Sequence, residues 1–146
     1  MTLLDLLQTE LLAAMKRRDL LRAEALRSIK AALQAETRGR FDALGETEAR
    51  RLLGRHRQRL QKLLLVYASY GARGDTRADA LVHELAVCDQ LLPVLDVSAL
   101  AQLLAALAPT VERPSVGRLL GALQQAAPGQ VDVQTAQALA QRLVLS

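Results

Sequence analysis

Residues 14–36 read A-M-K-R-R-D-L-L-R-A-E-A-L-R-S-I-K-A-A-L-Q-A-E, and this stretch decides the fold. It ends one amphipathic helix, offers Asp19 as the N-cap of a second, and repeats Leu26, Ile29 and Leu33 at helical spacing. Aromatic residues are only 2% of a chain that is 51% hydrophobic, so the core must be built from Leu, Ala, Val and Ile. That composition favours close helix packing over a β-sandwich, and we expect an all-α protein.

Capping and helix-breaking residues divide the rest of the chain into helices. Expected N-caps are Thr2, Asp19, Asp75 and Asp132, and expected stops are Gly39, Gly71, Gly74, Pro93, Pro109 and Pro128-Gly129. The expected helices cover about residues 3–17, 20–38, 46–70, 76–92, 97–108, 115–126 and 133–145. Between the second and third lies a loop, residues 39–45, with Phe41 and Leu44 as candidate anchors.

Pro93 also marks a domain boundary. Proline disfavours the α conformation in the residue before it, so residues 92–95 form the expected link. We predict a basic N-terminal four-helix domain, residues 1–92, and a smaller C-terminal three-helix domain, residues 96–146. A three-helix domain of this size is marginal alone.

The formal charge of +4 is distributed unevenly. Residues 1–62 contain 14 Lys and Arg against 8 Asp and Glu, whereas residues 63–146 contain 5 against 7. Sixteen of the 19 cations are Arg, whose guanidinium suits bidentate phosphate contacts. A GC-rich genome also enriches Arg, Ala and Leu without selection for binding, so composition leaves both explanations open.

The third expected helix carries a basic stripe. Its members follow one another at spacings of four, four and three residues, which at about 100° per residue places them on one face: Arg51, Arg55, Arg59 and Lys62. Like charges at this spacing repel, and a polyanion would offset the repulsion. A solvated face partly balanced by Glu46 and Glu48 is the alternative. Leu53, His56, Leu60, Leu63, Leu64 and Tyr67 should face the core.

Other kinds of site find little support in the sequence. Cys88 is the single cysteine, so an internal disulfide is excluded and a reducing cytoplasmic setting is expected. Its helical spacing with Leu81 and Leu85 predicts that Cys88 is a core residue. His56, His83 and Cys88 lack the paired spacing of a zinc site, so we expect no metal. We expect no cofactor either, because no phosphate loop, dinucleotide fingerprint or nucleophile elbow is present. Membrane-spanning and secretory segments are not expected.

Tyr67 and Tyr70, beside Arg73 and Arg77, could stack on nucleobases. Packing at a helix end is the alternative for these two aromatic residues.

Three spaced motifs resemble the YqeY-like family. Its opening motif is similar to residues 14–16, Asp19, Arg22, residues 26–32 and Glu36. Its central E-I-x-V-L-x-x-Y-L-P motif looks like residues 84–87 followed by residues 91–93. Its M-G-K-V-M-G-x-L segment is similar to residues 117–123. The resemblance runs through the chain in order. The chain departs from the family pattern in two places. At residues 57–59 the usual K-x-R-x-D-S stretch lacks its Asp-Ser, and at residues 128–132 the usual G-x-A-D-G is reduced to P-G-Q-V-D.

The resemblance implies a two-part helical protein related to the C-terminal tail domain of the B subunit of the tRNA-dependent amidotransferase (GatB), a domain associated with tRNA contact. We therefore expect a module that binds tRNA or another structured RNA by charge and shape. The expected phosphate-binding residues are Lys16, Arg18, Arg22, Arg27, Lys30, Arg51, Arg55, Arg59 and Lys62.

Two alternatives come from other functional classes. One is an adaptor that docks on an amidotransferase or synthetase through the apolar helices of residues 97–146. The other is the carbon–nitrogen ligase activity, with glutamine as amide donor, that the resemblance also implies. For that activity the chain shows no ATP site and no glutaminase nucleophile, so we expect no catalysis by the isolated chain.

Overall fold

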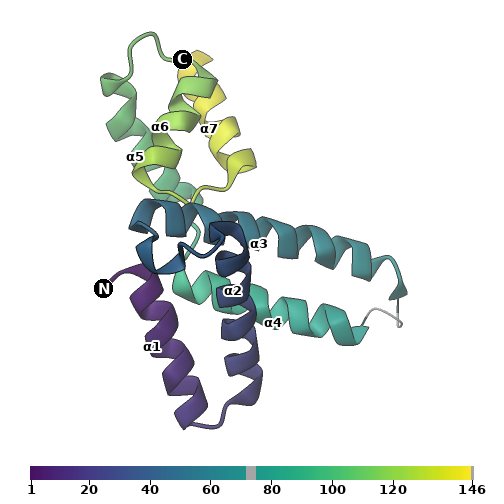
Figure 1. The fold of residues 1–146 in the computed structure, drawn as a ribbon. Helices are drawn as coiled ribbons and strands as arrows, with labels where there is room; N and C mark the ends of the chain where they lie inside the picture. Colours follow the sequence, from purple (N-terminus) through teal and green to yellow (C-terminus); the bar gives the residue numbers. More distant parts are fainter. Residues whose placement is uncertain (72–74, 146) are drawn as a thin grey trace. The chain divides into compact units, whose positions relative to one another are not determined.

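In the computed structural model, which describes residues 1–71 and 75–145, all regular structure is helical (Figure 1). The order is α1 (Leu3–Lys16), α2 (Leu20–Thr37), the 3₁₀ turn η1 (Phe41–Ala43), α3 (Glu46–Ala68), α4 (Asp75–Leu91), α5 (Val97–Leu107), the 3₁₀ turn η3 (Ala108–Thr110), α6 (Val116–Ala126) and α7 (Val133–Leu145). The expected all-α class is confirmed. No helix of the described part of the chain is long and apolar enough to cross a membrane.

The predicted caps of the first two helices are confirmed. Thr2 Oγ1 accepts a hydrogen bond from the Asp5 N–H at 3.1 Å, and the Asp5 carboxylate accepts one from the Thr2 N–H at 3.4 Å, which completes a capping box. Asp19 Oδ1 accepts from the Arg22 N–H at 3.2 Å and starts α2. The corner before it turns through a left-handed residue, Arg18, with φ 58°. These local bonds explain why residues 14–36 form two helices rather than one.

The end of α2 also follows the sequence signal. Arg38 has φ 48° and Gly39 has φ 86°, so two left-handed residues in succession stop the helix. At the next break, the predicted turn residue Gly74 and the side chain of the predicted cap Asp75 lie outside what the structure describes.

The chain divides into two compact units, Met1–Pro93 and Val94–Ser146. The first contains α1 to α4 and the second α5 to α7. That each unit is an independent domain, as predicted for residues 1–92 and 96–146, stays a prediction.

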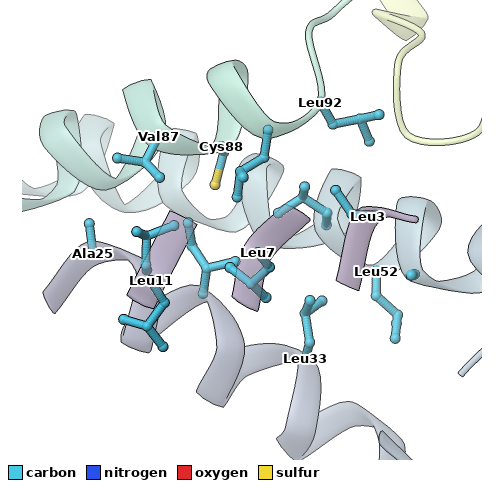
Figure 2. Close-up of a cluster of buried hydrophobic side chains, with 14 of the residues drawn as sticks. Leu3, Leu7, Leu11, Ala25, Leu33, Leu52, Val87, Cys88 and Leu92 are labelled. Carbon is cyan, nitrogen blue, oxygen red and sulfur yellow. The ribbon is translucent and has the colours of Figure 1, made fainter. Parts of the chain in front are cut away.

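The first unit is built around leucines from all four of its helices. In Figure 2, Leu3, Leu7 and Leu11 of α1 point toward side chains of the other helices, among them Leu33 and Leu52. Full burial of each such side chain contributes about 1.5–3 kcal/mol. The pairs α1 with α2, α2 with α4 and α3 with α4 pack against one another.

Two details of this core test the sequence predictions. Phe41 and Leu44 pack against its edge, so both predicted anchors of residues 39–45 are confirmed. Leu63 was expected to face the core but is 43% exposed. The reason is that Leu60 is the last buried residue of α3, so residues 61–68 of this helix lie beyond the buried core.

The second unit has a core of its own. Leu104 of α5, Leu119 and Leu123 of α6, and Ala136 and Ala140 of α7 form it. Asp96 and Ser115 cap α5 and α6, since each side chain accepts a hydrogen bond from a backbone N–H three residues later. At the predicted cap of α7, the Asp132 carboxylate accepts a hydrogen bond from the Thr135 hydroxyl at 2.7 Å.

Candidate nucleic-acid interface on α3

The four residues of the basic stripe, Arg51, Arg55, Arg59 and Lys62, are all exposed on α3. The opposite side of the same helix supplies core residues, including Leu53 and Leu60, both nearly inaccessible to solvent. Burial of that side orients the helix and presents the four cations together. The amphipathic pattern of the sequence therefore translates directly into a charged face.

One acid of α2 reaches the middle of the basic stripe. Arg59 Nη1 lies 2.6 Å from Glu36 Oε1, and this hydrogen bond and the charge of Arg59 hold the pKa of Glu36 below its usual range, with Arg55 adding to the effect. The pair is largely solvent-exposed, so its contribution to stability is small. Within the described residues Arg51, Arg55 and Lys62 make no ion pair, which leaves three cations of the stripe available.

Of the two acids that could balance the stripe, Glu46 and Glu48, the first has other partners. Glu46 Oε1 accepts from Arg50 Nε at 2.8 Å, and Glu46 Oε2 accepts from the Leu3 N–H at 2.8 Å. Arg50 is not a stripe residue. Glu46 thus joins the start of α3 to the start of α1 and does little to neutralise the basic stripe.

Two of the other predicted phosphate-binding residues already have side-chain partners on other helices. Arg22 is half-buried and binds Glu10 at 3.1 Å and Gln90 at 2.6 Å, so it links α2 to α1 and α4. Lys30 donates to Gln8 at 3.2 Å and lies 6.0 Å from the centre of the Phe41 ring. The three remaining cations are exposed around the first two helices: Lys16, Arg18 and Arg27.

A shallow groove runs beside the stripe between α2 and α3. Its walls are formed by Ala32, Ala35, Glu36, Arg38, His56 and Arg59. The groove gives the exposed face of α3 a concave border.

Sequence reasoning missed a buried polar contact behind this groove. His56 Nε2 lies 2.6 Å from Glu84 Oε2, and both residues are less than 10% exposed. The periodicity of α3 correctly placed His56 toward the core. The sequence does not identify its partner on α4, because residues 28 positions apart can be paired only by the tertiary fold.

Arg57 is the second residue that sequence reasoning missed. Although it lies between Arg55 and Arg59, it is only 4% exposed. It donates to the backbone carbonyls of Cys88 and Leu92 and forms an ion pair with Asp89 at 3.0 Å. Helical spacing could have predicted this burial, since Arg57 falls on the side of Leu53 and Leu60 rather than on the stripe. Arg57 therefore pairs the Leu92 carbonyl and adds a second donor to the Cys88 carbonyl, which also accepts from the Leu92 N–H.

Cys88 lies in the core, as its spacing predicted. Burial raises the pKa of its thiol to about 12, so the reactive thiolate is scarce at neutral pH. Among the described residues no three His, Cys, Asp or Glu side chains are grouped so as to hold a metal ion.

Comparison with known proteins gives one family. The family model described as Yqey-like protein matches residues 4–144, nearly the whole chain. A comparison with curated proteins gave no match.

Proposed function

Since the chain belongs to the Yqey-like protein family, we propose that its N-terminal unit is an RNA-binding module, with tRNA as the first ligand to test. The observation that carries the proposal is the exposed basic stripe of α3, in which Arg51, Arg55 and Lys62 make no ion pair among the described residues. As a tRNA-binding module the protein would act in the cytoplasm.

The stripe suits phosphate recognition for physical reasons. It extends over about 16 Å of helix, because each residue advances the axis by about 1.5 Å. Arg side chains can hold phosphate oxygens with two parallel hydrogen bonds, and each phosphate neutralised releases counterions. Recognition by backbone and shape agrees with a surface that offers charge but few groups for reading base edges.

The nine predicted cations contribute unequally to this proposal. Arg51, Arg55 and Lys62 need no rearrangement before binding. Lys16, Arg18 and Arg27 are exposed and extend the positive field, whereas Arg59 and Lys30 already have side-chain partners. Arg22 could reach a phosphate only by breaking its ion pair with Glu10 and its hydrogen bond to Gln90, so we infer that its main role is to stabilise the fold.

The adaptor hypothesis has weaker support. Its discriminating feature is an exposed leucine patch on residues 97–146. Leu104, Leu119 and Leu123 are buried in the second unit's own core, whereas Leu143 and Leu145 at the end of α7 are exposed. Docking on an amidotransferase or synthetase would have to use exposed residues of that unit. The ligase hypothesis has its own test, which is glutamine- or ATP-dependent turnover by the purified chain.

Binding to total tRNA across a salt series tests the proposal, with duplex DNA as the comparison ligand. The informative variant combines Arg51→Glu, Arg55→Glu and Lys62→Glu and leaves Arg59 with Glu36. We expect it to lower tRNA affinity by about ten-fold or more at low salt and to flatten the salt dependence.

A charge-matched control carries the same reversal at exposed cations elsewhere: Arg40, Arg113 and Arg142. It should lose much less affinity. If the stripe variant and the control bind tRNA equally well, the stripe is a solvated face and the proposal is wrong.

A further inference from the structure

The far end of α3 carries an aromatic pair. Tyr67 and Tyr70 are two of the three aromatic residues in the chain, and their ring centres lie 6.4 Å apart at an interplanar angle of 55°. Arg77 of α4 lies 6.0 Å from the centre of the Tyr67 ring and donates to its hydroxyl at 3.4 Å. Arg73, which the sequence also places nearby, lies outside the described residues.

The two rings differ in exposure. Tyr67 is half-buried and held by Arg77, whereas Tyr70 is 60% exposed. Tyr67 therefore has a structural role as a support, consistent with packing at a helix end. Packing does not explain why the second ring of an aromatic-poor chain remains in water.

Tyr70 follows the basic stripe along the chain. The face of α3 that carries Lys62 continues to Val66, four residues on, and α3 ends at Ala68, so Tyr70 lies two residues beyond the helix. Eight residues after Lys62, cations that suit phosphates are thus followed by an exposed ring that suits a flat, apolar group.

A nucleobase fits this combination better than an apolar protein side chain does. Every base has a π-face that stacks on aromatic rings, and it comes attached to the phosphates that the stripe would hold. Bases in a duplex are already stacked on one another, so only an unpaired base is free to do this.

We propose that Tyr70, supported by Tyr67 and Arg77, stacks an unpaired base of an RNA strand whose phosphates lie along the basic stripe. The ligand class is then single-stranded RNA, or a loop or end of a structured RNA. This inference rests on the proposed function.

Intrinsic fluorescence provides a direct test, because the chain has two Tyr and no Trp. A Tyr67→Phe variant leaves Tyr70 as the single tyrosine. It is titrated with an oligoadenylate RNA of about 12 nucleotides and with an abasic strand of equal length and charge. We expect both strands to bind with salt dependence and only the base-bearing strand to quench Tyr70.

Affinity measurements with matched variants complete the test. In the parent background, Tyr70→Ala should weaken oligoadenylate binding by about five-fold or more and leave abasic binding unchanged. Tyr70→Phe, which keeps the ring, should bind like the parent. Leu65→Ala removes an exposed apolar side chain of α3, 75% exposed, and should have no effect.

The outcomes separate this inference from the function on which it rests. Equal binding of both strands, without quenching and without an effect of Tyr70→Ala, overturns the stacking role and leaves the phosphate-binding stripe. Absence of binding to either strand overturns both. A dimer of the parent that dissociates in both Tyr70→Ala and Leu65→Ala would assign this surface to protein contact and overturn the stacking role.

Discussion

His56 of α3 and Glu84 of α4 meet through Nε2 and Oε2 at 2.6 Å, and each side chain is only 10% exposed. A buried hydrogen bond has a narrow range of favourable distances and angles, and leaving one partner unsatisfied is costly. The pair therefore favours one alignment of α3 with α4.

Removing Glu84 should destabilise the first unit markedly. Glu84→Ala leaves the His56 ring buried without its acceptor, and we expect a loss of about 2 kcal/mol in the free energy of unfolding. Urea denaturation followed by circular dichroism measures the change. Asp79→Ala, an exposed position of the same helix, should change stability by less than about 0.5 kcal/mol. Equal effects of the two variants would show that the buried pair does not position the helices.

Two nearby arginines of α3 should have different effects when substituted, Arg57 on stability and Arg55 on tRNA binding. Arg57→Met removes the donor to the Leu92 carbonyl and the ion pair with Asp89, and we expect it to cost about 2–4 kcal/mol of unfolding free energy. Arg55→Met lies on the exposed stripe, so it should leave stability within about 0.5 kcal/mol of the parent while weakening tRNA binding. Unfolding curves and tRNA titrations of both variants are needed. The assignment fails if Arg55→Met unfolds as readily as Arg57→Met.

Glu46 should make stability depend on pH in the acid range. Burial alone would raise the pKa of Glu46, but the hydrogen bonds from Arg50 and the Leu3 N–H outweigh it, so the pKa lies below the ordinary value of 4.5. A lowered folded-state pKa stabilises the protein above the unfolded value, and this stabilisation is lost as pH falls through the folded value. Glu46→Gln should therefore cost about 1 kcal/mol at neutral pH and progressively less as the pH falls below 4.5.

Urea midpoints of the parent and Glu46→Gln at several pH values check this prediction. Glu48→Gln, an exposed acid in the same first turn of α3, is the matched control and should show little difference from the parent. A constant difference between parent and Glu46→Gln at every pH would mean that ionisation of Glu46 does not contribute.

The first unit should fold as a domain by itself. Its core draws only on residues up to Leu92, so a fragment of residues 1–93 keeps every member of that core. We expect the fragment to be helical and to unfold cooperatively, as measured by circular dichroism on heating. A fragment of residues 94–146 is short enough to be marginal alone. If residues 1–93 melt without a cooperative transition, the predicted division into domains is wrong.

Much of the helical framework was predictable because its signals are local. The N-caps at Thr2 and Asp19, the stop at Gly39 and the period of the leucines all act over a few residues, and the structure follows them. The exposed face of α3 was predictable for the same reason. Leu63 shows the limit, since a side chain with core periodicity is buried only if another element covers it.

Sequence by itself determined that this chain is all-α and that four cations share one face of α3, because helix formation and side-chain direction depend on near neighbours. Only the tertiary structure decided which cations are engaged. Arg22, Arg57 and Arg59 have partners that lie 12 to 68 positions away in the chain, on other helices. An ion pair requires two groups within a few ångströms, and the folded core is what brings such distant residues together.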